Sequence, residues 1–239
     1  MAKDTAGAFD CWIDQGKPMK VCSYGEAKEG TKSVALLGDS HAAMLLPGLQ
    51  TQLAANNWKL DSYVGWGCQW MATGTGSECD GAMQSIQNRL TTGPKYDVVI
   101  VSGARHKTAT DKAWVSEMYA KAWAPVAERG TKIVVVADNP SVTDAALQCV
   151  SRVGFSVKDN DCATSTRDAF AVVDPLVKAV DQVPGAALVD LRSFFCNDTE
   201  CPVVIGNVIA YRDTVGHITG TFSKTLAPYL VSSIVAATG

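Results

Sequence analysis

Residues 34–43, Val-Ala-Leu-Leu-Gly-Asp-Ser-His-Ala-Ala, decide how the rest of the chain is interpreted. A continuously apolar run from Ser33 to Leu37 predicts a strand that is buried on both faces. A glycine ends the run, and a helical pattern of apolar residues extends from His41 to Ala55. A buried strand that turns through glycine into a helix is typical of a βαβ unit, so the stretch predicts a parallel sheet.

Strands and helices alternate along the rest of the chain. Further strands are predicted at 58–64, 96–102, 132–137 and 186–190, and further helices at 81–90, 114–129, 165–180 and 219–237. Pro47 is expected to kink or split the first helix, because proline has no amide hydrogen. Short apolar strands that alternate with longer helices predict a three-layer α/β/α sandwich with a five-stranded parallel sheet.

The same patterns predict the domain organisation. Residues 1–31 show weak periodicity and are expected to form an irregular N-terminal extension packed on the domain. Residues 32–239 contain no internal repeat or linker, so they are expected to form one α/β domain. Ligand sites in such domains lie beyond the carboxyl ends of the strands. The residues that follow predicted strands should therefore meet at one edge: Gly38, Gly65, Ser102 and Asp138.

Composition and charge argue against several classes of function. The net charge is −3, and the chain has neither a basic stripe nor a polybasic cluster, so nothing indicates binding to nucleic acid or to a membrane surface. No apolar run reaches the roughly 18 residues that span a bilayer. The three histidines, His41, His106 and His217, do not complete a zinc pattern with the cysteines, so no metal or cofactor is expected.

The cysteines indicate an oxidising compartment. There are eight, and none belongs to a Cys-x-x-Cys motif. Cytosolic chains rarely carry so many thiols without a metal to bind. They form four sequence-local pairs, which predict bridges between Cys11 and Cys22, Cys68 and Cys79, Cys149 and Cys162, and Cys196 and Cys201. Free buried cysteines are the alternative, because spacing alone does not prove connectivity.

Two interpretations of Gly-Asp-Ser-His are open on local grounds. In one, Asp39 or Ser40 simply caps the helix. In the other, Ser40 is a nucleophile whose own amide, unpaired in the first helical turn, helps to hold the oxyanion. A serine nucleophile needs a base, and Asp213 precedes His217 by four residues just before the last predicted helix. In that interpretation Asp39 orders the turn, and His41 is a neighbouring groove residue rather than the base.

These residues resemble the blocks of the SGNH (GDSL-like) hydrolase superfamily, whose fold is flavodoxin-like. Within it, "VALLGDSHAAMLLPGLQ", "CPVVIGNVIAYRD" and "FSKTLAP" are similar to the extracytoplasmic domain that follows a membrane acyltransferase-three O-acyltransferase, especially in actinobacteria. The similarity covers residues 20–235. It implies extracytoplasmic transfer of an acyl group, most often acetyl, onto a cell-envelope glycan or glycolipid. The membrane domain of the same parent chain would deliver the acyl donor.

The chain departs from the family pattern at two places. The family usually has Asp-x-x-His, whereas one more residue separates Asp213 from His217, and Thr214 at the usual offset has no carboxylate. Gly216 is expected to let the loop absorb the extra residue. The second departure follows the third predicted strand, where residues 101–106 read Val-Ser-Gly-Ala-Arg-His in place of Gly-x-Asn-Asp.

Without that asparagine, the oxyanion donors must be other groups. In the second loop Gly65 and Gly67 both qualify, and Gly67 is preferred because the adjacent cysteine would anchor it. The third loop offers three candidates: the amides of Gly103 and Ala104 and the side chain of Arg105. For Arg105, binding of an anionic or sugar group and an ordinary ion pair both stay open. Trp66 and Trp70 beside the second loop either stack on a sugar ring or fill the core.

Two functions from different classes follow from these features. The first is serine-dependent O-acyl transfer through an acyl-serine on Ser40, and with water as the acceptor the same groups would make a carbohydrate O-acetyl esterase. The second is a catalytically weak SGNH module that binds glycan, motivated by the missing asparagine and the stretched Asp…His spacing. Ester hydrolysis that depends on Ser40 would distinguish the two.

Overall fold

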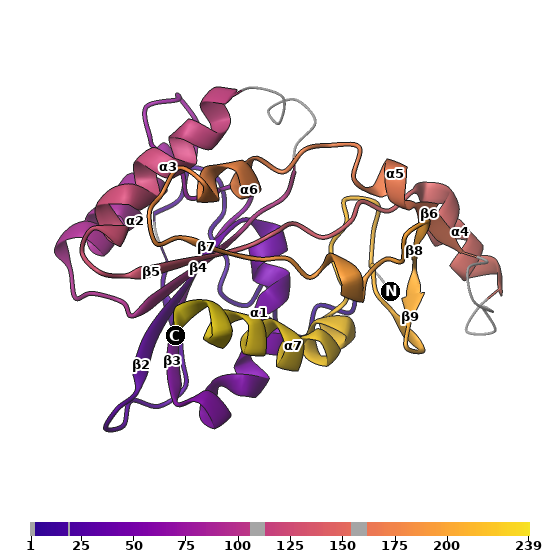
Figure 1. The fold of residues 1–239 in the computed structure, drawn as a ribbon, viewed down its shortest axis with the longest axis horizontal. Helices are drawn as coiled ribbons and strands as arrows, with labels where there is room; N and C mark the ends of the chain where they lie inside the picture. Colours follow the sequence, from indigo (N-terminus) through magenta and orange to yellow (C-terminus); the bar gives the residue numbers. More distant parts are fainter. Residues whose placement is uncertain (1–2, 19, 106–112, 154–161) are drawn as a thin grey trace.

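A six-stranded sheet organises the computed structural model, which describes residues 3–18, 20–105, 113–153 and 162–239 (Figure 1). Its strands lie in the order β1-β3-β2-β4-β5-β7. They are β1 (Cys22–Tyr24), β2 (Lys32–Gly38), β3 (Trp58–Val64), β4 (Val98–Ser102), β5 (Lys132–Val136) and β7 (Ala187–Val189). The five strands from β3 to β7 are parallel, which confirms the predicted sheet, and β1 adds an antiparallel edge that the sequence did not predict.

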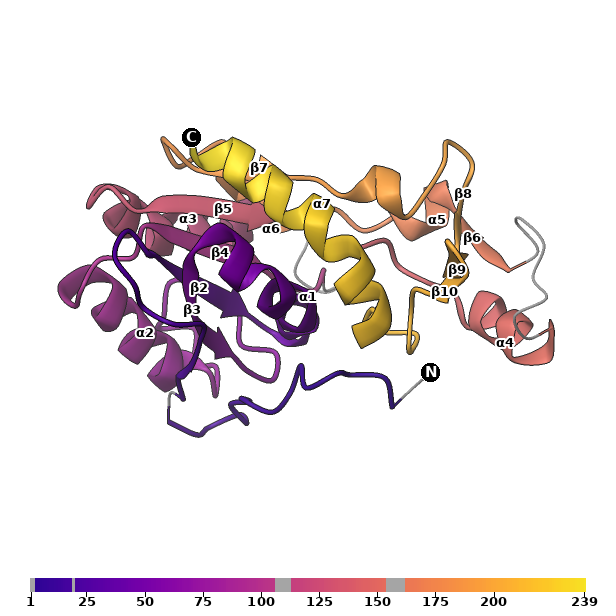
Figure 2. The same ribbon diagram turned by 90° about the horizontal axis from the view of Figure 1, so that it is seen from below.

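Helices cover both faces of this sheet (Figures 1 and 2). One face packs against α1 (Ser40–Asn56) and α7 (Gly220–Thr238), and the other against α2 (Asp80–Thr92), α3 (Ala113–Ala127) and α6 (Pro175–Val180). The side chains of β2 alternate between the two layers, with Val34 and Leu36 in the first core and Ala35 and Leu37 in the second. The predicted three-layer α/β/α sandwich is therefore present.

Two details of the helices differ from expectation. Residues 165–180 form two short helices, α5 (Thr166–Ala169) and α6, instead of one. The Asp174 side chain accepts a hydrogen bond from the Leu176 amide at 2.9 Å and so starts α6 anew, with Pro175 in its first turn. By contrast, α1 continues through Pro47 without a break.

A smaller, partly irregular region extends beyond one end of the sheet (Figure 2). It contains α4 (Asp144–Val153), the antiparallel pair of β6 (Ala163–Ser165) and β8 (Glu200–Pro202), and the hairpin of β9 (Val204–Ile205) and β10 (Val208–Ile209). A 3₁₀ turn at Arg192–Phe194 leads into it from β7. The sequence did not predict these elements, because all except α4 are too short to show a clear period.

All eight cysteines form bridges, and the connectivity is the one predicted from their spacing. Two of the bridges, Cys149–Cys162 and Cys196–Cys201, lie in the smaller region, where little regular structure is available to order the chain. Among the described helices, none is both long and apolar enough to cross a bilayer.

The N-terminal segment runs beside the carboxyl edge of the sheet. Ile13 forms an isolated bridge with Gly65, and the Asp4 carbonyl accepts a hydrogen bond from the Gly220 amide at 2.9 Å. The segment therefore lies between the second loop and the start of α7. The division of the chain at residue 31 stays a prediction.

Candidate active site

The turn after β2 can be made only by glycine. Gly38 has φ +146°, and a Cβ atom there would lie 1.8 Å from the carbonyl oxygen of Ser102 on the adjacent β4. This close approach brings the ends of β2 and β4 together at the carboxyl edge of the sheet. The residues after β2 and after β4 therefore share one site.

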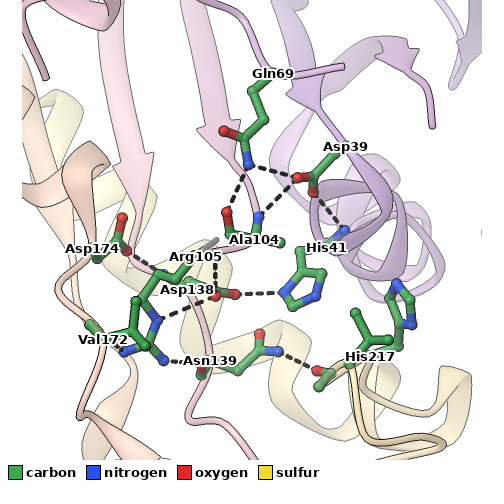
Figure 3. A network of polar contacts seen from close by, with 12 residues as sticks. Asp39, His41, Gln69, Ala104, Arg105, Asp138, Asn139, Val172, Asp174 and His217 are labelled. Carbon is green, nitrogen blue, oxygen red and sulfur yellow. Dashed lines mark hydrogen bonds and ion pairs between the residues drawn. The ribbon is translucent and has the colours of Figure 1, made fainter. Parts of the chain in front are cut away.

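The Asp39 side chain connects three loops around this turn by hydrogen bonds. Its carboxylate accepts hydrogen bonds from the His41 amide at 2.9 Å and the Ala104 amide at 2.9 Å, and from Gln69 Nε2 at 2.6 Å (Figure 3). Gln69 Nε2 also donates to the Ala104 carbonyl at 2.8 Å. Asp39 caps α1 and is 1 % exposed, so the acid has the capping role, and the nucleophile interpretation of Ser40 stays a prediction.

Ser40 is the first residue of α1, and its amide therefore has no partner within the helix. Among the described residues, neither the Ser40 amide nor the exposed Gly67 amide donates a hydrogen bond. The Gly65 amide, in contrast, donates to the Gly38 carbonyl at 3.2 Å. Of the two glycines considered for the oxyanion, only Gly67 therefore offers a free donor.

Most of the third-loop candidates are engaged inside the protein. The Ala104 amide donates to Asp39, and the Arg105 amide donates to Asp138 Oδ2 at 2.9 Å. The Arg105 side chain, 4 % exposed, pairs with Asp138 at 3.2 Å and donates to two backbone carbonyls. Arg105 thus forms an ion pair inside the protein, and a role for it in binding substrate or the oxyanion stays a prediction. The Gly103 amide is left as the third-loop candidate, whereas His106 lies outside the described residues.

Asp213 and His217 are hydrogen-bonded despite the extra residue between them. His217 Nδ1 lies 2.8 Å from Asp213 Oδ2, while Asp213 Oδ1 accepts the amides of Val215 and His217. Gly216 adopts φ +100°, which lets the loop close over the longer spacing. Burial alone would raise the pKa of Asp213, but the hydrogen bonds and charge of His217, together with Arg212, lower it, so the carboxylate is ionised at neutral pH.

His217 Nε2 is buried and has no hydrogen-bond partner among the described residues. No hydrogen bond joins it to Ser40 in this structure, and such contacts often tighten only when substrate binds. The His217 ring lies beside the start of α1, because its centroid is 5.0 Å from that of His41, the residue after Ser40. Phe9 of the N-terminal segment meets His217 edge-on at 6.4 Å.

A second imidazole–carboxylate pair, His41 and Asp138, lies beside the His217 ring (Figure 3). His41 Nδ1 is 2.6 Å from Asp138 Oδ1, and the two side chains are 3 % and 5 % exposed. Burial opposes a charge on His41, yet the attraction of Asp138, Asp39 and Asp213 and the hydrogen bond to Asp138 together raise the pKa of His41 to about 9. Burial and the charge of Asp138 raise the pKa of the nearby Asp174 to about 6.

A cavity of about 230 Å³ opens next to the second loop. Its lining includes Gly67, Gln69, Met71, Met83 and Trp114, so it is mainly apolar and adjoins the free Gly67 amide. The described part of the chain contains no cluster of histidine, cysteine and acidic side chains that could hold a metal ion.

The two tryptophans of the second loop have different roles. Trp70 is 1 % exposed and donates from Nε1 to Gln87 at 2.8 Å, so it belongs to the core. Trp66 is 61 % exposed and is available to a ligand.

Comparison with known proteins finds a matching family and a similar solved structure. The family model described as "SGNH domain (fused to AT3 domains)" matches residues 6–232. The fold is similar to the periplasmic domain of a lipopolysaccharide acetyltransferase from Salmonella ser. Paratyphi A, with a TM-score of 0.64 and 15 % sequence identity over 87 % of this chain and 85 % of that one. No curated protein matches the sequence.

Proposed function

Because the chain belongs to the family of SGNH domains that are fused to AT3 domains, we propose that it transfers an acyl group, most simply acetyl, to a hydroxyl of a cell-envelope glycan or glycolipid. The likeness to the periplasmic domain of a lipopolysaccharide acetyltransferase supports this choice of reaction and acceptor. The four disulfides support an extracytoplasmic location. In this proposal the membrane domain of the same parent chain supplies the acyl donor.

The reaction proceeds through an acyl-serine. His217 Nε2 takes the proton of Ser40 Oγ as the oxygen attacks the acyl carbonyl, and the amides of Ser40 and Gly67 stabilise the negative charge on the carbonyl oxygen. Asp213 keeps the proton of His217 on Nδ1 and stabilises the imidazolium that forms. His217 then gives its proton to the leaving group. In the second half, His217 takes a proton from the acceptor hydroxyl as that oxygen attacks the acyl-serine. His217 then gives this proton to Ser40 Oγ as the bond to the serine breaks.

One observation carries this proposal more than any other. The Asp213–His217 pair is formed, and its outer nitrogen, which has no hydrogen-bond partner among the described residues, lies beside a helix that begins with Ser40. A purely capping Ser40 would need no oriented imidazole nearby. The alternatives are an esterase with the same site and a glycan-binding module, the latter favoured by the absence of a third-loop asparagine.

Replacing Ser40 with alanine tests this proposal. We expect Ser40→Ala to lower hydrolysis of para-nitrophenyl acetate at neutral pH by at least about 10³-fold, because no nucleophile remains. Ser85→Ala is the matched control, since that exposed hydroxyl donates to the Gly81 carbonyl within α2, and its loss should leave the rate unchanged. Equal rates for Ser40→Ala and the wild type would exclude a Ser40-dependent enzyme.

Product analysis separates transfer from hydrolysis. With an activated acetyl ester and an envelope glycan together, the transferase yields an O-acetylated glycan detectable by mass spectrometry. Release of acetate alone would identify an esterase. If the protein binds the glycan but shows no Ser40-dependent turnover, it is a binding module.

A further inference from the structure

A buried network connects the end of β5 to the loop that carries His217. Asp138 follows β5 and is held by His41 at 2.6 Å and by the amide and side chain of Arg105. Its own amide donates to Asp174 Oδ2 at 2.9 Å. The next residue, Asn139, donates from Nδ2 to the Gly216 carbonyl at 2.6 Å (Figure 3). Two adjacent residues therefore contact both the Ser40 helix and the His217 loop.

His41 completes the link from the other side. Its ring and that of His217 lie 5.0 Å apart at an angle of 56°. A Cβ atom added at Gly216 would stand only 3.5 Å from His41 Cε1, so the imidazole packs directly against the backbone of the loop. The loop that carries His217 is thus held from two directions, by the ring of His41 and by the amide of Asn139.

We propose that His41, Asp138 and Asn139 are positioning residues, which together hold the His217 loop at the distance and orientation that acyl transfer from Ser40 requires. This inference rests on the proposed function, because it takes His217 as the base. None of these three residues belongs to the proposed catalytic triad of Ser40, His217 and Asp213. His41 packs beside His217, Asn139 holds the carbonyl of the adjacent Gly216, and Asp138 holds His41. Their effect should therefore fall on the rate of the chemical step, since they position the base rather than the substrate.

At neutral pH the network holds an ion pair between a protonated His41 and an ionised Asp138. Burial would raise the pKa of Asp138, but the charges and hydrogen bonds of His41 and Arg105 lower it, so the carboxylate is ionised. The pKa of about 9 keeps His41 protonated. The charged groups that face His41 are Asp138 after β5, Asp39 at the start of α1 and Asp213 before α7, with His217 beside it. Above about pH 9, His41 loses its charge and the ion pair weakens.

The decisive variant is Asn139→Ala, which removes one side-chain hydrogen bond and leaves the buried ion pair intact. We expect it to lower kcat by about 10- to 100-fold with KM within about twofold of wild type, because a small displacement of the base slows the chemistry. Asn88→Ala is the matched control, on the exposed surface of α2. An Asn139→Ala protein that melts at a lower temperature but keeps the wild-type kcat when folded would overturn the inference.

The pH profile gives a second readout that a merely structural role would not change. In the wild type, kcat should fall on the alkaline side with a midpoint near pH 9, as His41 deprotonates. His41→Gln should be slower at all pH values and should lack this limb. The nearby phenols do not account for it, because burial raises the pKa of Tyr119 and Tyr211 well above the ordinary range. An identical alkaline limb in His41→Gln would contradict the inference.

Ser40→Ala is measured alongside Asn139→Ala and His41→Gln, so that a failure of the proposed function can be distinguished from a failure of the positioning role. If wild type and Ser40→Ala hydrolyse the ester equally, the proposed function fails and this inference fails with it. If hydrolysis depends on Ser40 while Asn139→Ala matches the wild type in kcat, only the positioning role is refuted.

Discussion

Replacing His217 with asparagine is expected to lower kcat/KM for ester hydrolysis by about 10⁴-fold. An asparagine side chain can still donate to Asp213, but its amide cannot accept the proton of Ser40 at neutral pH. The loss should appear in kcat, because the base acts on the transition state and not on the binding of substrate. Steady-state kinetics with para-nitrophenyl acetate measure it, with the spontaneous rate subtracted.

The fold should survive this change. The side chain of His217 is 15 % exposed, and its polar contact with another side chain is the one with Asp213. A melting temperature close to that of the wild type would therefore show that the lost activity is chemical. Retention of more than about a tenth of the wild-type kcat/KM would mean that another group is the base.

Gly38→Ala is expected to have the largest effect on stability. The new Cβ atom would meet a backbone carbonyl at 1.8 Å, and no side-chain rotation can relieve that contact. The φ of +146° is also strained for alanine. We expect a loss of more than about 4 kcal/mol, which is a large part of the stability of a typical domain. Insoluble protein, or a melting temperature lower by more than about 10 °C, would be the result.

Gly81→Ala provides the contrast. Gly81 lies in the first turn of α2, where a Cβ atom would meet nothing within 4 Å. Alanine there should be neutral, or stabilising by about 0.5 kcal/mol, because it restricts the unfolded chain. If thermal melts with the disulfides intact showed equal stability for the two variants, the close approach of β2 to β4 would not be a constraint on the fold.

Most of the parallel sheet could be predicted from the sequence, because its strands are short apolar runs that end at glycine or polar residues. The strand at 58–64 was predicted at its observed bounds. The edge strand β1 was not, since its residues carry no apolar pattern and it is ordered by pairing with β3 and by the Cys11–Cys22 bridge. The break before α6 was not predicted, because the apolar spacing of residues 165–180 continues across it, while the cap at Asp174 and Pro175 starts a new helix.

The candidate site shows a similar division. The sequence predicted Ser40, Asp213 and His217 as catalytic residues, because their residue types and order suit one reaction. The sequence did mark Asp138 as a residue that follows a strand, but it gave no role to Asp138 or Asn139. Their roles depend on partners about 100 residues away in His41 and about 80 residues away in Gly216, and no local pattern reveals such contacts.

The oxyanion donors illustrate how tertiary contacts narrow a list of candidates. Local sequence left Gly65, Gly67 and the third loop nearly equivalent. In the structure the Gly65 amide and Arg105 are used within the protein, while the amides of Gly67 and Ser40 are free among the described residues. A site with two backbone donors in place of an asparagine remains able to stabilise an oxyanion, because preorganised amides need no reorganisation during the reaction.

The most direct test of the account is to label the protein with a fluorophosphonate, which forms a stable adduct with an activated serine. Peptide mass spectrometry should find one modified residue, Ser40, and the labelling should be strongly slowed in His217→Asn. Labelling of a different serine, or an unmodified Ser40 in a protein that hydrolyses esters, would contradict the claim that Ser40 is the nucleophile.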